Sequence, residues 1–132
     1  MIFFESEGGY FLDIYEQLEK EKQIKQEINR LKKLYKNMSK EKVKLLDGLI
    51  KEAAFMKVLL EELRDAVVHN GVTEVFKQGK QEIRVERKES KLYTTYISKY
   101  TQVMKQLIDI LPPEEKKIEQ DKLTEFVNSK KK

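Results

Sequence analysis

The chain has no cysteine and no tryptophan, and its 132 residues include only two prolines, five glycines and one histidine. The lack of cysteine excludes disulfides, thiolate metal sites and cysteine nucleophiles, and it favours a reducing compartment. The few helix breakers, together with a charged fraction of 38%, favour long helices with solvated faces over a compact sandwich. The length is that of one domain.

Residues suited to catalysis or cofactor binding are also scarce. The single histidine, His69, falls at the expected end of a helix, where a cation suits the helix dipole, so we assign it no catalytic role. Gly8-Gly9 lacks the lysine and hydroxyl residue that complete a P-loop. The acidic residues within 61–65 lack the spacing of a calcium loop. We therefore expect no enzyme activity, no catalytic or metal-binding residues, no cofactor and no small-molecule substrate.

Long hydrophobic runs are missing as well. The N-terminus opens with Met1-Ile2-Phe3-Phe4 but turns acidic at Glu5, without a basic start or a long apolar segment. Such a start fits neither a secretory signal peptide nor a membrane span. We therefore expect a soluble cytoplasmic protein without a membrane partner, in the host cytoplasm if the chain is viral.

The positive charge is concentrated in one stretch of the chain. Residues 1–19 contain five acidic and no basic side chains, whereas residues 20–44 contain ten basic and three acidic ones. A cationic cluster attracts phosphate backbones or acidic partners, although such runs on helices are more often plain solvated faces. The side chains that we expect to contact DNA are Lys22, Lys25, Arg30, Lys32, Lys33, Lys36, Lys40 and Lys44.

The pattern of apolar residues predicts three long helices. Residues 10–38 form the first, whose opening turns break the apolar stripe and are expected to project from the body. Ser39 caps the second, which ends at Asn70-Gly71, and Ser90 caps the third, which ends at Leu111. Apolar side chains three and four residues apart form seams on the second and third helices, for the core or for contacts between subunits: Leu49, Ala53, Met56, Leu60, Leu63, Tyr93, Ile97, Tyr100, Met104 and Leu107.

Residues 72–88 alternate apolar and charged side chains around Gln78-Gly79-Lys80, which predicts a short β-hairpin. One hairpin is marginal in water, so we expect it to pack on helices or to pair with a copy from another subunit. Pro112-Pro113 ends the third helix, and the last helix, with its poor apolar stripe, is expected to be a loosely docked arm.

Together these elements predict a mainly α fold of long antiparallel helices with one short β-hairpin. We expect residues 10–113 to form the helical core and oligomerisation domain. Residues 1–9 would then be an N-terminal tail, and residues 114–132 a C-terminal helix with a basic tail.

The central part of the chain resembles a known family. The run LIKEAAFM at residues 49–56, followed by Leu60, Leu63 and then NGVTE at residues 70–74, is similar to the core of terminase small subunits from tailed bacteriophages of Gram-positive hosts. The later Tyr93, Tyr96-Ile97, Tyr100, Gln106-Leu107 and Leu111-Pro112 look like the C-terminal helix of that family. The likeness covers roughly residues 45–113, about half of the chain.

The resemblance implies a helical protomer that assembles into a ring-like homo-oligomer, binds double-stranded viral DNA and delivers it to the terminase large subunit. That large subunit carries the ATPase and nuclease activities. Many small terminases of other groups begin with a helix-turn-helix domain, but none is evident in residues 10–38. The alternative function is a coiled-coil protein–protein adaptor or scaffold that uses the same apolar seams without binding DNA.

Overall fold

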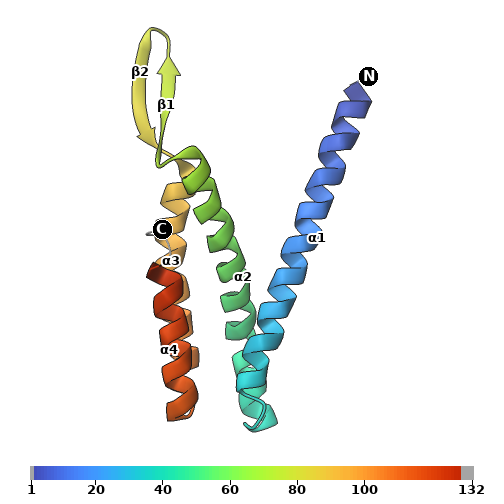
Figure 1. Cartoon of the computed structure of the whole chain (residues 1–132), viewed down its shortest axis with the longest axis vertical. Coiled ribbons are helices and arrows are strands. Elements are labelled where there is room, and N and C mark those ends of the chain that lie inside the picture. The colour runs from blue at the N-terminus through green and yellow to red at the C-terminus, as the bar shows by residue number, and fades with distance from the viewer. Residues whose placement is uncertain (1, 129–132) are drawn as a thin grey trace.

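The computed structural model describes the backbone of residues 2–128 and the side chains of residues 14–128. The elements follow in the order α1 (Ile2–Leu34), α2 (Lys40–Asn70), β1 (Thr73–Gln78), β2 (Gln81–Glu86), α3 (Lys88–Asp109) and α4 (Pro113–Asn128) (Figure 1). The described chain is mainly helical with one antiparallel hairpin, as the sequence predicts. Within it, no helix combines the length and the hydrophobicity needed to cross a bilayer.

Helix α1 is longer at its start and shorter at its end than predicted. It begins at Ile2, so residues 2–9, which we expected to be a tail, continue the helix. Two adjacent glycines cost a helix about 1 kcal/mol each, and the good helix formers that follow outweigh this cost. The helix ends at Leu34, because Tyr35 and Met38 donate backbone hydrogen bonds to carbonyls only three residues back, of 3.1 and 3.0 Å, and tighten the chain into a turn.

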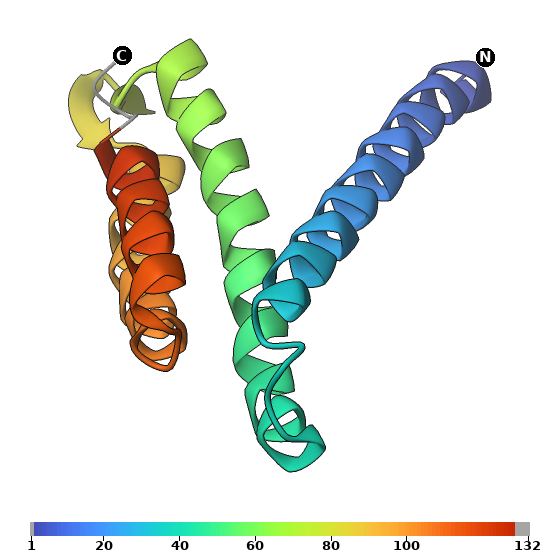
Figure 2. The same ribbon diagram turned by 60° about the horizontal axis from the view of Figure 1, so that its bottom comes forward.

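The four helices form a body from which half of α1 projects. Helices α2 and α3 run antiparallel, α4 turns back beside α3, and α1 packs on α2 near their connection. Beyond that region α1 diverges from α2, and the two helices form the arms of an open V (Figures 1 and 2). The predicted projection of the first turns is therefore confirmed. Lys20 still reaches α2, where its Nζ lies 2.7 Å from Oε1 of Glu62.

Helix α2 has the ends that the sequence predicts. The Ser39 hydroxyl accepts a hydrogen bond of 3.2 Å from the Lys42 backbone N–H, which satisfies one of the free donors of the first turn. At the other end Gly71, with φ of 86°, donates its N–H to the Val67 carbonyl at 2.7 Å. This positive φ is accessible to glycine at little cost, and it turns the chain toward the hairpin.

The core lies between α2, α3 and the last turns of α1. It consists of Leu31, Tyr35, Leu46, Ile50, Ala53, Met56, Leu60, Tyr100, Met104, Leu107, Ile108 and Leu111. Most of the residues assigned from the sequence to the core or to subunit contacts are thus buried within one protomer. Leu63 is also buried, whereas Leu49, Tyr93 and Ile97 are only partly covered and border the core. The predicted seams of α2 and α3 thus pack largely against each other.

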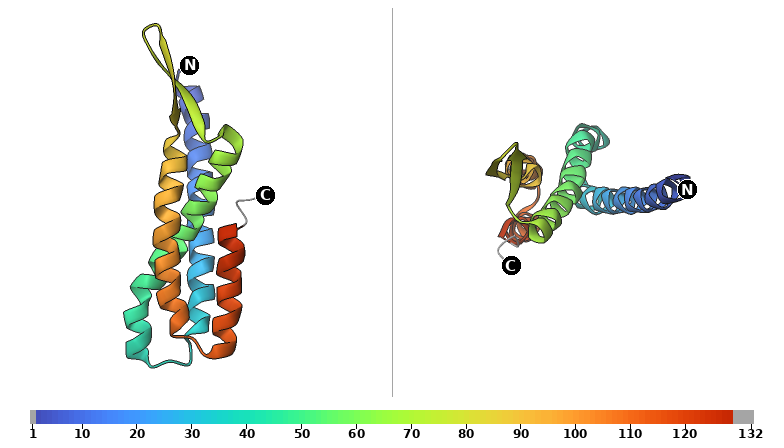
Figure 3. Two further views of the ribbon diagram at one scale, coloured as in Figure 1. Left: turned by 90° about the vertical axis from the view of Figure 1, so that its left-hand side faces the viewer. Right: turned by 90° about the horizontal axis from the view of Figure 1, so that it is seen from above.

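The hairpin stands apart from the helices (Figure 3). Its two-residue loop has a positive φ of 62° at Gly79 and not at Lys80, the pattern of a type II′ turn. Phe76 pairs with Ile83 across the strands, and both side chains are about half exposed, at 51% and 47%. The hairpin therefore does not pack its apolar face on the helices of its own protomer.

Helix α3 begins two residues before the predicted cap, because β2 leads into it through Arg87 alone. Arg87 occupies the cap position without a side-chain hydrogen bond to the helix. Ser90, predicted to be the cap, lies inside the helix, and its hydroxyl donates a 2.8 Å hydrogen bond to the Glu86 carboxylate. The prediction of Ser90 as the cap is therefore wrong.

Helix α4 begins at Pro113 and carries Glu114 and Glu115 in its first turn, as predicted. Most of this helix is exposed, as expected of a loosely docked arm, but its inner face has specific anchors on the body. Glu119 is only 2% exposed, and the Phe126 ring lies 5.3 Å from the Tyr100 ring, centroid to centroid. The end of the predicted basic tail, residues 129–132, lies outside the described residues.

A buried hydrogen bond joins Tyr35 to the end of α3. The buried hydroxyl of Tyr35 donates a 2.6 Å hydrogen bond to the Leu107 carbonyl, one of the last four of α3, which lack partners within the helix. Burial raises the pKa of Tyr35 to about 12, so this donor stays protonated at neutral pH.

Tyr35→Phe should lower the free energy of unfolding in urea by about 1 to 2 kcal/mol, because a buried acceptor loses its donor. Tyr15→Phe, at a side chain that is 70% exposed, should change stability little; equal effects of both substitutions would contradict this role.

Candidate nucleic-acid interface

The connection between α1 and α2 gathers lysines from both of its sides. Lys32 comes from the last turn of α1, Lys36 from the connection itself, and Lys40 and Lys44 from the start of α2. All four line a cleft of about 420 Å³, whose other lining residues are Met38, Val43 and Asp47. We call this site the basic cleft. It unites four of the eight side chains that the sequence predicts to contact DNA.

The two helix ends at the basic cleft have opposite effects on its lysines. Lys32 lies in the last turn of α1, where the partial negative charge of the helix end stabilises a cation. Lys40 and Lys44 lie at the start of α2, where the partial positive charge opposes cations. The protein alone thus gains nothing from lysines at this helix start, whereas a bound anion would neutralise both the lysines and the helix end.

Few acidic side chains compensate the basic cleft. Asp47 lies 2.9 Å from the Lys51 Nζ and 3.6 Å from the Lys32 Nζ. The hydrogen bond from Lys51 is the main cause that lowers the pKa of the Asp47 carboxyl group, and the charge of Lys32 adds to it. Within the described residues Lys36, Lys40 and Lys44 form no ion pair. Three cations of the cleft are therefore exposed to solvent and available to an anion.

The other four predicted side chains lie elsewhere. Lys22 and Lys25 are exposed on the part of α1 nearer to its N-terminus, and Lys33 is exposed beside the basic cleft without lining it. Arg30 points into the body, toward α4. The structure thus divides the basic stretch of the sequence into a cleft, an exposed helix surface and a partly buried ion-pair network.

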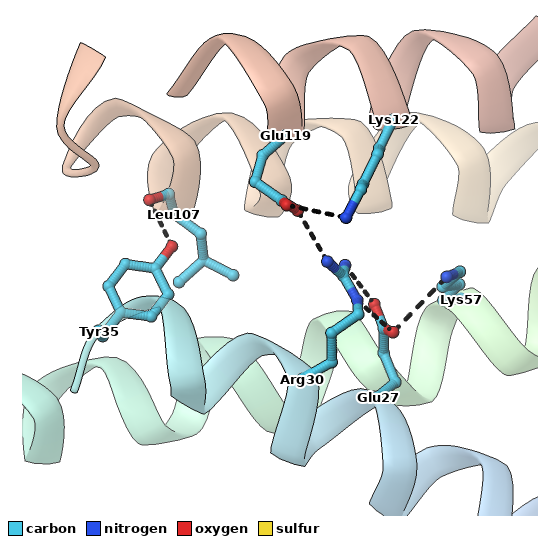
Figure 4. Close-up of polar contacts among 7 residues, drawn as sticks. All are labelled: Glu27, Arg30, Tyr35, Lys57, Leu107, Glu119 and Lys122. Atoms are coloured by element: carbon cyan, nitrogen blue, oxygen red, sulfur yellow. Dashed lines mark hydrogen bonds and ion pairs between the residues drawn. The ribbon is translucent and has the colours of Figure 1, made fainter. Parts of the chain in front are cut away.

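Arg30 joins α1 to α4 (Figure 4). Its Nε and Nη2 donate hydrogen bonds of 2.8 and 2.9 Å to the two carboxylate oxygens of Glu27, and its Nη1 donates one of 2.9 Å to Glu119. These bonds raise the pKa of Arg30 above its ordinary value, the bond with Glu27 most of all. The fork of the guanidinium therefore binds carboxylates of its own chain.

Two lysines complete this network. Lys57 of α2 lies 3.5 Å from Glu27, and Lys122 of α4 lies 3.4 Å from Glu119. Burial raises the pKa of the Glu27 carboxyl group, but the hydrogen bond from Arg30 and the charges of Lys57 and Arg30 together lower it below its ordinary value of 4.5. Glu27 therefore remains charged at neutral pH, with Arg30 and Lys57 beside it.

Sequence reasoning missed Lys57 and Glu119. Glu119 could have been found from its spacing, because it precedes Leu123 by four residues and Phe126 by seven. This spacing puts a carboxylate on the same helical face as two apolar residues. A charged residue in an apolar stripe indicates a buried partner of opposite charge. Its partner lies 89 residues away in sequence, so no local pattern identifies Arg30.

The described side chains contain no group of three or more histidine, cysteine or acidic residues that could hold a metal ion. His69 is exposed at the end of α2. Comparison of the chain with protein-family models, curated proteins and solved structures finds no match. Inferences about function therefore rest on the basic cleft and its surroundings.

The network predicts a loss of stability in acid. The folded protein holds the pKa of Glu27 below 4.5, so its contribution is complete above that pH and is lost as the pH falls through the folded value. Glu27→Gln should lower the free energy of unfolding at pH 7 by about 3 kcal/mol, because Arg30 and Lys57 lose a buried partner. It should also flatten the dependence of stability on pH below 4.5. Glu52→Gln, at an exposed carboxylate, is the matched control; an unchanged acid profile in Glu27→Gln would refute this assignment.

Proposed function

We propose that this chain is a DNA-packaging initiator of the terminase small-subunit type, which binds viral duplex DNA and recruits a large subunit with ATPase and nuclease activity. The observation that carries the proposal is the basic cleft, where lysines on both sides of a helix connection converge with little acidic compensation. The chain itself then acts by binding and not by catalysis.

Phosphate groups are the ligand that fits the basic cleft best. Lysine ammonium groups bind phosphate oxygens as mobile point charges, without the directional fork of arginine. The cleft lies at the α1–α2 connection. This connection is at the closed end of the V (Figure 2). No element presents a recognition helix for base edges within the described residues, so backbone geometry would dominate recognition.

Exposed apolar side chains support the proposed assembly into a ring-like homo-oligomer. Leu45 and Phe55 of α2 are 80% and 47% exposed, and Leu92 of α3 is 45% exposed. The hairpin adds the uncovered Phe76 and Ile83. Burial of such surface between copies is favourable, and each added copy would bring another basic cleft to the same DNA, so that weak contacts add.

The second candidate is a protein–protein adaptor that does not bind DNA. The exposed apolar face of the hairpin favours it, because that face suits any protein partner and does not depend on the lysines. The two functions share the same fold and differ in the ligand of the basic cleft. DNA affinity and its dependence on salt therefore discriminate between them.

The test of DNA binding uses three exposed lysines of the cleft. Lys36→Glu/Lys40→Glu/Lys44→Glu should weaken binding to duplex DNA at low salt by at least about tenfold in a fluorescence-anisotropy titration. The corresponding alanine variant should reduce the slope of log affinity against log salt by up to about 3, since each phosphate contact contributes about 0.9.

The matched control for this test carries the same charge change on other helices. Lys91→Glu/Lys105→Glu/Lys117→Glu reverses three exposed lysines of α3 and α4 that do not line the cleft. This control should bind DNA more tightly than the cleft variant, because the two differ in the position of the charges and not in their number. Equal weakening by both variants would contradict a role for the cleft, and no binding by the wild-type chain at low salt would favour the adaptor.

The test of assembly uses Leu45. Because this side chain is 80% exposed in the protomer, Leu45→Glu should leave the helix content and the thermal unfolding of the protomer unchanged. It should shift the mass distribution in light scattering toward smaller species, since a charge at an apolar contact between copies is costly. A wild-type chain that stays monomeric at all concentrations would rule out the ring.

A further inference from the structure

Helix α4 occupies a groove formed by the other three helices. Its inward side chains are Glu119, Leu123 and Phe126, which follow one another at intervals of four and three residues. This spacing is how a short amphipathic helix places its anchors when it binds in a groove of another protein. Here the helix belongs to the same chain and is joined to α3 by residues 110–112.

The two outer anchors have defined partners on the body. The Glu119 carboxylate accepts a 2.9 Å hydrogen bond from Arg30 of α1. The Phe126 ring has the Arg64 guanidinium 4.6 Å and the Lys57 ammonium 5.9 Å from its centroid. Arg64 also donates a 2.9 Å hydrogen bond to the Phe126 carbonyl. The groove thus selects a carboxylate at one end and an aromatic ring at the other.

Between these anchors α4 fills the groove incompletely. A cavity of about 470 Å³ lies between α4 and the body, lined on the body side by Arg30, Lys57, Tyr100 and Met104. Among the described residues of α4 only Glu119 is buried, and Ile118 is 53% exposed. The anchors of α4 are therefore few: the ion pair of Glu119 with Arg30 and the packing of Leu123 and Phe126 against the body.

The body side of the groove carries more positive than negative charge. Arg30, Lys57 and Arg64 face the occupant, whereas Glu27 is the acidic side chain beside them. The apolar walls of Tyr100 and Met104 and the carboxylate of Glu27 oppose a phosphate backbone in this place. A helix with carboxylates and apolar side chains matches both the charge and the walls.

We propose that this groove is a docking site for an acidic amphipathic helix of a partner protein, and that α4 is its built-in competitor. The partner helix carries a carboxylate, a leucine four residues later and an aromatic residue three residues after that. A tethered helix competes at an effective concentration in the millimolar range, so the partner binds strongly only when it fills the cavity that α4 leaves or when α4 is weakened. This inference concerns a different surface from the basic cleft and does not depend on DNA.

The experiment uses the full chain and a labelled peptide with the sequence of residues 113–128. Glu119→Gln/Phe126→Ala in the chain removes both outer anchors of its own α4 but leaves the groove intact. This variant should bind the peptide at least about tenfold more tightly than the wild-type chain in fluorescence anisotropy, because the competitor is weakened. This gain in affinity should disappear when Arg30→Gln is added to the variant. It should also disappear when the peptide carries glutamine at the position of Glu119. Glu114→Gln in the chain, at an exposed carboxylate of the same helix, should have no effect.

Hydrogen exchange of the wild-type chain tests the release of α4 without any substitution. The α4 amides should exchange faster than those of the α3 core, because a helix held by few anchors can open without the rest of the fold. Equal exchange of the two helices would overturn the proposal, because α4 would then open only with the whole fold. Equal affinity of the variant and the wild-type chain for the peptide would also overturn the proposal. So would a variant that forms dimers by exchanging α4 helices and binds no peptide, because the groove would then be occupied by a second copy of the chain.

Discussion

The guanidinium of Arg30 is the point on which the arrangement of the helices depends. It lies on α1, binds Glu27 of the same helix and Glu119 of α4, and shares Glu27 with Lys57 of α2. Removing Arg30 leaves each of the two buried carboxylates with one lysine as its cationic partner, which costs more than the loss of a surface ion pair. Together with the buried Leu31 and Tyr35, the network holds the end of α1 against the body, at the place where the chain turns back into α2.

That turn decides which lysines lie together. Lys32 and Lys36 meet Lys40 and Lys44 only because α1 and α2 are held side by side at their connection. The same fold thus uses cations in two ways. The cations of the basic cleft are hydrated and could bind a phosphate that is itself partly hydrated. The cations around Glu27 and Glu119 are partly desolvated and are neutralised by carboxylates of the protein.

The sequence predicts the elements better than their contacts. The cap at Ser39, the glycine at residue 71 and the two prolines after Leu111 act locally, so the ends of α2 and the start of α4 could be located from a few neighbouring residues. The docking of α4 could not, because its main anchor is charged and its partner is distant in sequence. Arg30 belongs to the same basic stretch as the lysines of the cleft, and only the packing of α4 separates their roles.

The projecting half of α1 has a consequence for encounters in solution. The helix has 33 residues and is thus about 50 Å long. The first 19 residues of the chain carry acidic and no basic side chains, while the other end of the helix meets the basic cleft. In the field of a polyanion the acidic end is repelled and the basic end attracted, so the molecule experiences a torque before any contact forms. Under the proposed DNA-binding function, the long helix would orient the protomer as it approaches DNA.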